Sequence, residues 1–256
     1  MRPLVSIIIP CFNHGKYINE VIDSIKMSAN DCYYEIIIIN DGSSDEETIL
    51  ILSELEQKKY SIVHQKNQGL SNARNKGILL SKGKYIITID ADDKITPVYF
   101  QKGIDILEEN PEVGIIYGNS MHFGDETRNY IAGQFSLKKL LVENYISSCI
   151  LFRKVVWENC NGYDANLTAY EDWDFNLSTA TAGWKFHYIP EVVFEYRILR
   201  DSMLRSHKNL NDCINYIAKK HGILYRKEFL KNITIKDRIK SISIDLFKKI
   251  IGRPNY

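Results

Sequence analysis

Three carboxylates within four residues form the most chemically distinctive segment of the sequence. Asp90, Asp92 and Asp93, with Ala91 among them, directly follow the apolar run Lys84–Ile89, which is typical of a buried strand. Carboxylates this close repel one another, and a divalent cation relieves the repulsion. Mg²⁺ and Mn²⁺ typically take one or two carboxylates together with phosphate oxygens of a substrate. The segment therefore predicts a metal site, with a solvated acidic loop as the alternative.

A second acidic turn follows another apolar run. Asp41 and Gly42 come after Glu35–Ile39, a run of β-branched residues that predicts a central parallel strand. Gly42 permits a tight turn, and Asp41 could accept a hydrogen bond from a base or a ribose. A turn leading into a helix cap explains the same residues equally well.

Two further segments carry residues suited to a nucleotide. Pro10, Phe12 and Asn13 follow the first predicted strand, where Phe12 could stack on a base and Asn13 could form a hydrogen bond nearby. The alternative is a turn with a core Phe. A predicted helix opens within Gln68–Asn75, and its N-terminus could help bind phosphate, while Arg74 could face the cleft. A plain surface arginine is the alternative.

A helix start in the second half is strongly acidic. Glu171 and Asp172 precede Trp173, and all three lie near the beginning of a helical pattern. Acidic residues there satisfy the helix dipole, which is the simpler explanation. The functional interpretation makes one carboxylate a general base, its pKa raised by its neighbours, with Trp173 packing on an acceptor.

Strands and helices that alternate along the first half must position these residues. Strands are predicted over Leu4–Ile9, Glu35–Ile39, Ser61–His64, Lys84–Ile89, Val113–Tyr117, Ser148–Phe152 and Val192–Tyr196. Helices are predicted over Gly15–Ser28, from Ser44 with Glu47 completing a capping box, over Ser71–Leu80, from Thr96 with Pro97 at its first position, and over Tyr170–Ala182. This alternation indicates an α/β fold with a mainly parallel central sheet flanked by helices. Ligands of such sheets bind beyond the carboxyl ends of the strands, where the candidate residues lie.

The composition is that of an ordinary globular protein. The 256 residues are 45% hydrophobic and 25% charged, and no apolar run approaches the roughly 20 residues that span a bilayer. The first residues do not resemble a signal peptide, since Pro10 ends a short apolar run. Five scattered cysteines without CxxC spacing suggest neither zinc nor a disulfide framework, and a reducing compartment fits best.

Charge is distributed unevenly along the chain. Residues 208–256 contain 12 Lys and Arg against 4 Asp and Glu, a net charge of +8, whereas the whole chain carries +1. A basic amphipathic helix in this tail could lie on an anionic membrane surface. A helix packed on the catalytic domain is the alternative, and nucleic acid is not expected as a partner because no binding motif accompanies the charge.

Taken together, the sequence resembles the inverting glycosyltransferases of family 2, which have the GT-A fold. The resemblance spans roughly residues 4–202 and rests on these segments in order: Pro10–Asn13, Asn40–Ser43, Gly69–Asn75, Asp90–Asp93, Gly162–Asp164, Glu171–Asp174 and Tyr196–Arg197. No single segment is specific, but their order is. Two departures are Asn40, where family members often have Asp, and Leu199, where many carry a His that helps to hold the metal or diphosphate.

The resemblance implies a role for each candidate residue. Phe12 would stack on the nucleobase, Asp41 would bind its imide edge, and Asp90 would contact the ribose. Asp92 would bind Mg²⁺ or Mn²⁺, and Asp172 would be the general base. The other expected nucleotide-binding residues are Pro10, Asn13, Arg74 and Ala91, and the acceptor-binding ones are Glu171 and Trp173.

The expected function is inverting transfer of a sugar from a nucleotide sugar, by resemblance a UDP-sugar, to a hydroxyl of a glycan or lipid-linked acceptor in bacterial cell-surface polysaccharide synthesis. The alternatives are a non-catalytic nucleotide-sugar-binding module and a sugar nucleotidyltransferase, although the latter would be expected to carry a Gly-rich phosphate loop after the first strand. Residues 1–117 would form the nucleotide-sugar-binding half of one GT-A domain, 118–205 its acceptor-binding half, and 206–256 a basic helical C-terminal extension. The expected location is the cytoplasm, with peripheral attachment to the inner face of the plasma membrane as a further hypothesis.

Overall fold

The computed structural model describes residues 3–29, 32–200 and 209–225. Its strands are β1 Val5–Cys11, β2 Tyr34–Asp41, β3 Ser61–Gln65, β4 Tyr85–Thr88, β5 Lys94–Ile95, β6 Val113–Gly124, β7 Arg128–Tyr130, β8 Leu151–Arg153 and β9 Lys185–Ile198. Its helices are α1 Gly15–Ala29, α2 Glu46–Gln57, α3 Leu70–Leu80, α4 Ile104–Glu109, α5 Leu137–Leu140, α6 Lys154–Asn159, α7 Glu171–Thr181 and α9 Leu210–Lys220, with a π-helical turn, η1, over Tyr99–Gly103.

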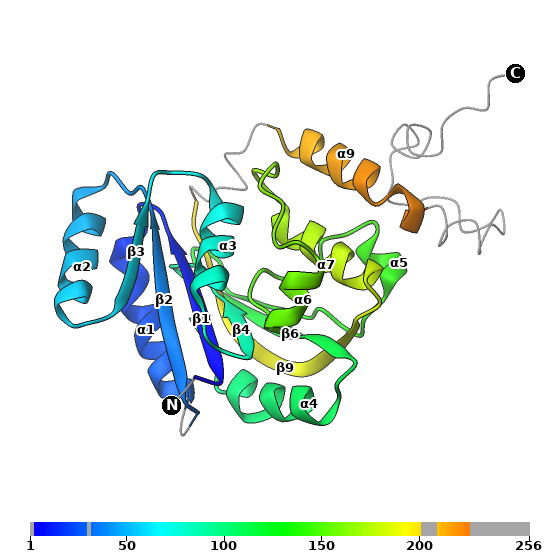
Figure 1. Cartoon of the computed structure of the whole chain (residues 1–256), viewed down its shortest axis with the longest axis horizontal. Helices are drawn as coiled ribbons and strands as arrows, with labels where there is room; N and C mark the ends of the chain where they lie inside the picture. Colours follow the sequence, from blue (N-terminus) through cyan, green and yellow to red (C-terminus); the bar gives the residue numbers. More distant parts are fainter. Residues whose placement is uncertain (1–2, 30–31, 201–208, 226–256) are drawn as a thin grey trace, which may run out of the picture.

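The strands form one mixed sheet, in which parallel and antiparallel pairs both occur. Within the described residues their order is β3-β2-β1-β4-β8-β6-β9-β5, with β7 on β6 (Figure 1). The first four strands are parallel, as the alternation of elements predicts. β8 then enters antiparallel to both of its neighbours, β4 and β6, and β5 pairs antiparallel with β9. The parallel prediction therefore holds for the first four strands and for the long β6–β9 pair, but not for the pairings of β8, β5 and β7.

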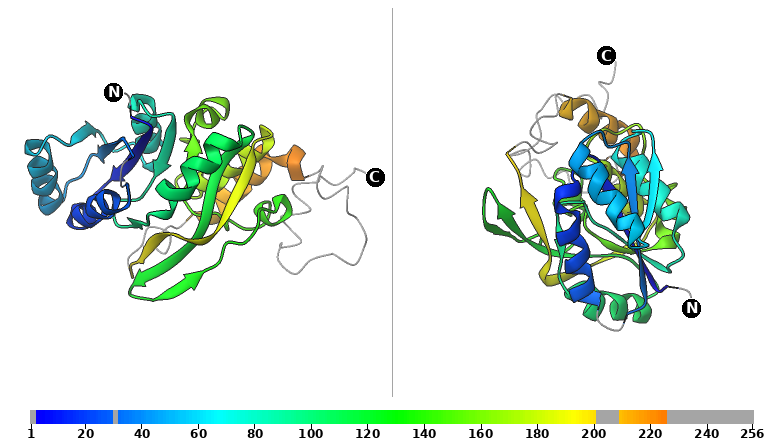
Figure 2. Two further views of the ribbon diagram at one scale, coloured as in Figure 1. Left: turned by 90° about the horizontal axis from the view of Figure 1, so that it is seen from below. Right: turned by 90° about the vertical axis from the view of Figure 1, so that its left-hand side faces the viewer.

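Helices cover both faces of the sheet, which is why the central strands are apolar on both sides. In β1, Ile7 and Ile9 face the cluster formed with α1, α2 and α4, whereas Ile8 faces the cluster formed with α3, α6, α7 and α9. Figure 2 shows these layers from two sides. β2 is buried from Ile36 to Asp41, as predicted for a central strand.

Two helix starts differ from the predicted ones. The cap of α2 is Asp45, whose carboxylate accepts a hydrogen bond from the Thr48 backbone N at 2.8 Å, so Ser44 and Glu47 do not form the predicted capping box. Past Pro97 the chain first forms the π-helical turn η1 and becomes α-helical at Ile104.

The two predicted halves share one strand. β6 runs from Val113 to Gly124 and crosses the expected boundary between residues 117 and 118. It pairs with β8 on one side and, over most of its length, with β9 on the other. The expected boundary therefore falls inside one continuous sheet and does not separate two units.

The first part of the basic C-terminal segment packs on the domain. Cys213, Ile217 and Ala218 of α9 are buried in the cluster that also contains α7. Lys220 and His221 both bond the buried carboxylate of Asp174, each at 2.8 Å. For α9 the packed-helix alternative is therefore confirmed, and the predicted helix beyond residue 225 lies outside the described residues.

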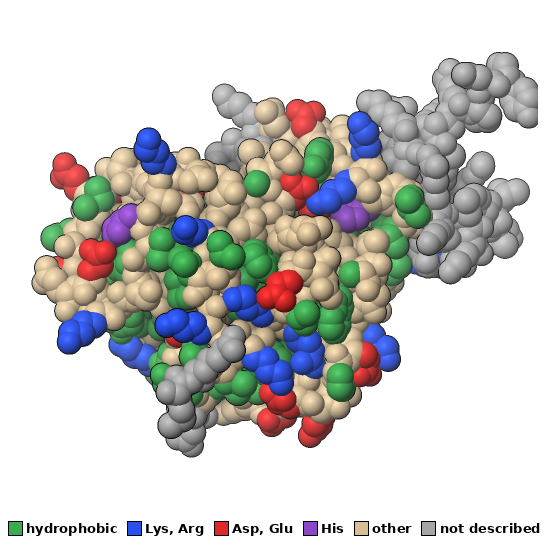
Figure 3. All heavy atoms as spheres, in the orientation of Figure 1, with side chains coloured by type: hydrophobic (Ala, Val, Ile, Leu, Met, Phe, Trp, Pro, Cys, Tyr) green, Lys and Arg blue, Asp and Glu red, His purple; other side chains and the backbone are tan. Residues whose placement is uncertain are grey.

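Acidic and basic side chains are interspersed over the face of the molecule in Figure 3. Within the described ranges, no helix has the length and apolar character needed to cross a bilayer. All five cysteines are free thiols, as expected from their spacing.

Candidate nucleotide-sugar site

The loops after β1, β2 and β4 meet at one edge of the sheet, because parallel neighbours end on the same side. Asp41 is the last residue of β2, and its buried carboxylate accepts hydrogen bonds from the backbone N of Gln68 at 2.9 Å and of Gly69 at 2.8 Å. Gln65 Nε2 donates a third bond at 2.8 Å. Asp41 therefore fixes the loop before α3. If Asp41 also contacts a base, as predicted, its carboxylate does so while accepting these three hydrogen bonds.

The turn after Asp41 is tightly built. Gly42 has φ 74°, and a Cβ at this position would lie 2.6 Å from the backbone N of Asn67. Both the left-handed conformation and the close approach exclude a side chain, so the Gly predicted to permit a tight turn is required here.

The loop after β1 presents an aromatic ring to solvent. Pro10 is buried within β1, whereas Phe12 is 45% exposed and free to stack on a ligand. Asn13, with φ 56°, accepts hydrogen bonds from the backbone N of Ser44 at 2.8 Å and of Asp45 at 3.0 Å. Asn13 therefore fixes the loop to the start of α2 with its side-chain oxygen.

The three clustered aspartates point to three different partners. Asp90 accepts hydrogen bonds from Arg74 at 2.7 Å and from Ser148 Oγ at 3.2 Å. Asp92 lies 3.5 Å from His14 Nδ1. Asp93 is buried and accepts a bond from the backbone N of Arg197 at 2.9 Å.

The neighbouring carboxylates still repel one another in this arrangement. Burial, together with the charges of Asp92 and Asp90, raises the pKa of Asp93 well above its usual value. Asp90 and Asp92 remain partly exposed, at 27% and 16% of their side chains, while Ala91 between them is buried.

The oxygens available here suit a hard cation that is bound together with a substrate. Within residues 3–29, 32–200 and 209–225, no three histidine, cysteine or acidic side chains converge as a preformed metal site. A cation bridging a diphosphate needs only one or two carboxylates, and the partly exposed Asp92, with Asp90 beside it, supplies them. Hydrogen bonding to Asp92 raises the pKa of His14, so these two side chains already attract each other.

Arg74 lies in the interior, not on the surface. Its side chain is 1% exposed, and its guanidinium bonds Glu171 through one nitrogen and Asp90 through another. The charges of these carboxylates raise the pKa of Arg74 against the opposing effect of burial. The surface alternative for Arg74 is therefore wrong, and Arg74 connects the residues after β4 to the start of α7.

Asp172 is a half-buried carboxylate held by a side-chain amide. Asn144 Nδ2 lies 3.1 Å and 3.2 Å from its two oxygens, and the backbone N of Trp173 donates to it at 2.8 Å. Burial, and then the charge of Glu171, raise the pKa of Asp172 to about 7. A carboxyl group with this pKa can accept a proton near neutral pH.

The backbone immediately before this helix is strained. Tyr170 has φ 62°, in the left-handed region that a bulky residue rarely occupies. Such conformations cost on the order of 1–3 kcal/mol and cluster at functional sites. The backbone at the start of α7 is therefore strained, at a cost in local stability.

The two predicted acceptor-binding residues are buried. The side chain of Glu171 is 6% exposed, and its carboxylate forms an ion pair with Arg74. Trp173 is buried as well, and its indole nitrogen donates to the carbonyl oxygen of Leu140. These placements argue against the predicted contacts with an acceptor, because neither side chain has a free surface to offer.

Sequence reasoning missed His14, Asn144, Ser148 and the backbone of Arg197 as partners of the aspartates. Asn144 is 28 residues from Asp172, and Ser148 is 58 residues from Asp90. No local pattern signals such contacts. For His14, the only available signal is its position directly after the candidate residue Asn13.

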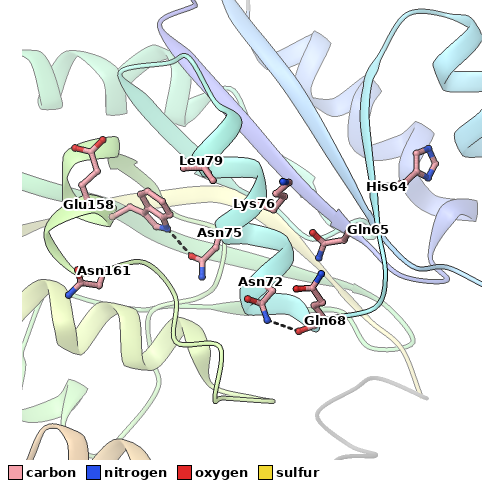
Figure 4. A pocket seen from close by; sticks show the side chains of 10 residues that line it. His64, Gln65, Gln68, Asn72, Asn75, Lys76, Leu79, Glu158 and Asn161 are labelled. Atoms are coloured by element: carbon pink, nitrogen blue, oxygen red, sulfur yellow. Dashed lines mark hydrogen bonds between the residues drawn. The ribbon is translucent and has the colours of Figure 1, made fainter.

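A polar groove of about 620 Å³ lies between α3 and α6 (Figure 4). Gln65 and Gln68, which bond Asp41, are among the residues that line it. None of the predicted site residues lines it. Asn75 and Trp157 are among the residues that line it, and the indole nitrogen of Trp157 donates to the amide oxygen of Asn75 at 2.8 Å.

Comparisons with known proteins give the family and the fold of the chain. The profile of Glycosyl transferase family 2 matches residues 6–191. An uncharacterized glycosyltransferase of Bacillus subtilis, EpsJ, is 29% identical over 77% of this chain and 62% of its own length, so the chain spans less than two thirds of that relative. An uncharacterized glycosyltransferase of Methanocaldococcus jannaschii, MJ1057, is 28% identical over 91% of this chain and 83% of its own.

Solved structures show the same fold at low sequence identity. The crystal structure of S. aureus TarS in complex with UDP-GlcNAc gives a TM-score of 0.70 at 15% identity, covering 88% of this chain and 67% of that one. The mannosyltransferase PcManGT of Pyrobaculum calidifontis, in complex with GDP-Man and Mn²⁺, gives 0.57 at 17% identity, covering 98% and 68%.

Proposed function

The chain belongs to glycosyltransferase family 2, and we propose that it transfers a sugar from a nucleoside diphosphate to an acceptor hydroxyl with inversion at the anomeric carbon. The observation that carries this proposal is the linked pair of sites. Arg74 joins Asp90, at the end of β4, to the helix turn that holds Asp172. A donor bound at the first site would lie next to a proton acceptor at the second.

In the proposed donor site, the exposed ring of Phe12 stacks on the nucleobase and Asp41 shapes the loop beside it. Asp90 contacts the ribose. Asp92 holds Mg²⁺ or Mn²⁺, which when bound neutralises negative charge on the departing diphosphate. Residues 1–117 then supply donor binding and residues 118–205 acceptor binding.

In the proposed reaction, Asp172 acts as the general base. Its carboxylate takes the proton from the acceptor hydroxyl, and the acceptor oxygen attacks the anomeric carbon on the face opposite the diphosphate. The new C–O bond forms as the bond to the diphosphate oxygen breaks, through an oxocarbenium-like state. The products are the inverted glycoside, the nucleoside diphosphate and a proton held on Asp172.

We propose a UDP-sugar as donor and a glycan or a lipid-linked sugar as acceptor, in the synthesis of a bacterial cell-surface polysaccharide. The family resemblance supports UDP, and TarS, a neighbour in fold, was crystallised with UDP-GlcNAc. PcManGT carries GDP-Man with Mn²⁺, so the experiment must include guanosine donors as well.

A two-step experiment tests the proposal. Thermal-shift screening of nucleotide sugars with Mn²⁺ identifies the donor, for which we expect a rise in melting temperature. Release of nucleoside diphosphate is then measured with and without candidate acceptors. Binding of nucleotide sugars with no release under any acceptor would favour a non-catalytic binding module.

A further inference from the structure

The first turn of α7 contains two acidic residues with opposite surroundings. Glu171 faces the interior and bonds Arg74. The adjacent Asp172 is half-buried, and among the described residues its partners are Asn144 and the backbone N of Trp173. One side chain is therefore already committed to the protein, and the other retains access to solvent.

Arg74 itself is held on several sides. Its guanidinium lies 5.5 Å from the ring centroid of Tyr163 and bonds carboxylates from two separate elements. The next residue of α3, Asn75, binds the backbone of Tyr163 through both its oxygen and its nitrogen at 2.8 Å. These contacts fix α3, the loop after β4 and the start of α7 relative to one another.

We propose that Arg74 and Glu171 form a positioning pair that holds the first turn of α7, and with it the carboxylate of Asp172, against the donor site. This inference rests on the proposed function. It reassigns Glu171 from the acceptor site to the support of the proposed base, and Arg74 from nucleotide contact to the link between the two halves.

The pair also affects the ionisation of Asp172. Glu171 raises the pKa of Asp172, while Arg74 and Asn144 lower it. Within the described part of the chain, Asp172 also interacts with Tyr163, Tyr170 and Tyr196, whose own pKa values are all raised. They stay neutral near pH 7, so the charged groups that face Asp172 are Glu171 and Arg74, and Arg74 is also paired with Asp90.

The test compares full-length wild type with Glu171→Gln, which keeps the shape of the side chain and removes its charge. The measurements are kcat against pH at saturating donor, the KM for acceptor, and UDP affinity in the presence of Mn²⁺. We expect the acid limb of the pH profile to move to lower pH by about half a unit or more, because a negative neighbour is lost. We expect the plateau of kcat to fall about ten- to a hundred-fold, because misplacement of a catalytic group by ~1 Å costs on that order.

Two further variants bracket this result. Asn144→Ala removes the hydrogen bond that favours the ionised form of Asp172, so its acid limb should move to higher pH. Glu143→Gln removes an exposed carboxylate from the same segment and should leave limb and plateau unchanged. Opposite shifts in Glu171→Gln and Asn144→Ala, with none in Glu143→Gln, would support the positioning role.

The inference is overturned if Glu171→Gln raises the acceptor KM and leaves the acid limb in place, since Glu171 would then act as an acceptor contact. If Glu171→Gln does not fold, Glu171→Asp replaces it: this variant keeps the charge and shortens the reach, so the limb should stay and the plateau fall. An unchanged plateau in Glu171→Asp overturns the inference. A wild type that turns over no donor refutes the proposed function instead, which separates the two failures.

Discussion

At the scale of single residues, the environment of Asp172 decides what the site can do. Its carboxylate is half-buried, bonded by Asn144 and flanked by Glu171, and its pKa is raised to about 7. An exposed aspartate would be fully ionised and a poor proton acceptor at neutral pH. Burial beside a second carboxylate gives the group the affinity for a proton that a general base needs.

Replacement of this base gives the most direct prediction. Asp172→Asn should lower kcat by about 10²–10⁴-fold, the usual contribution of a general base. Nucleotide affinity should stay within a few-fold, because Asp90 and Asp92 are unchanged. Steady-state kinetics and UDP titration measure the two quantities. Normal turnover in the variant would refute the assignment of Asp172 as the base.

The pH dependence of the wild type follows from the same pKa. A base acts only when ionised, so kcat should level off above about pH 7 and fall roughly tenfold for each pH unit below it. The profile is measured as kcat at saturating donor from about pH 5 to about pH 9, a range that extends to both sides of the pKa. In Asp172→Asn the residual rate should lose this limb, and its persistence there would assign the limb to another group.

Removal of the divalent cation gives a separate prediction. EDTA should stop the reaction and Mg²⁺ or Mn²⁺ should restore it, because the carboxylates at the end of β4 would otherwise face the diphosphate without a bridging charge. Asp92→Asn should not recover at a cation concentration that restores the wild type. Full activity in excess chelator would exclude the cation from the proposed mechanism.

At the scale of the elements, the position of α3 determines where Arg74 lies. This helix packs very closely against the sheet. Gly77 is buried against β1, and a Cβ there would approach Ile8 Cγ2 to 2.4 Å. The absence of a side chain at residue 77 lets the helix approach the strands. Arg74, one turn earlier on the same helix, is thereby held within reach of both of its carboxylate partners.

Gly77→Ala should therefore destabilise the protein, although Ala is normally the better helix former. The overpacking cost of about 1–3 kcal/mol exceeds the gain of up to about 1 kcal/mol from helix propensity. Lys76→Ala on the exposed side of α3 is the matched control and should change the free energy of unfolding by less than about 0.5 kcal/mol. Urea unfolding compares the three proteins. Equal midpoints would show that Ile8 moves aside without cost.

The elements also show what the sequence could and could not predict. The strands β1, β2 and β4 are apolar on both faces, so their runs and the polar residues that end them stand out locally. β9 extends from Lys185 to Ile198, but its many exposed and half-buried positions leave only Val192–Tyr196 recognisable. The partners of the candidate residues could not be predicted, because they come from distant parts of the sequence. Arg74 and Glu171, for example, are 97 residues apart.

At the scale of the whole molecule, α9 packs onto the layer of helices that contains α7. Its buried residues cover α7, and Lys220 also bonds Asp164 at 2.7 Å. Residues 226–256, which lie outside the described part, carry nine Lys and Arg against three Asp and Glu. Any attraction of the chain to an anionic surface should therefore arise mainly after Tyr225.

Co-sedimentation with vesicles tests this attraction. The full chain should bind vesicles that contain anionic lipid, with on the order of 1 kcal/mol for each basic residue near the surface, and salt should weaken the binding. A chain ending at Tyr225 should remain in the supernatant while keeping its thermal stability. Membrane docking is wrong if the full chain also ignores anionic vesicles.

The strand that crosses residues 113–124 has a consequence for engineering and for evolution. Because it belongs to both halves, a chimaera joined at residue 118 would place two parental sequences in one strand, each with its own fit to β9. Exchange of whole halves between relatives is therefore an unpromising way to combine a donor preference with a new acceptor. Grafting of the connections between strands leaves the shared ladder intact, so specificity can diversify there while the frame is inherited unchanged.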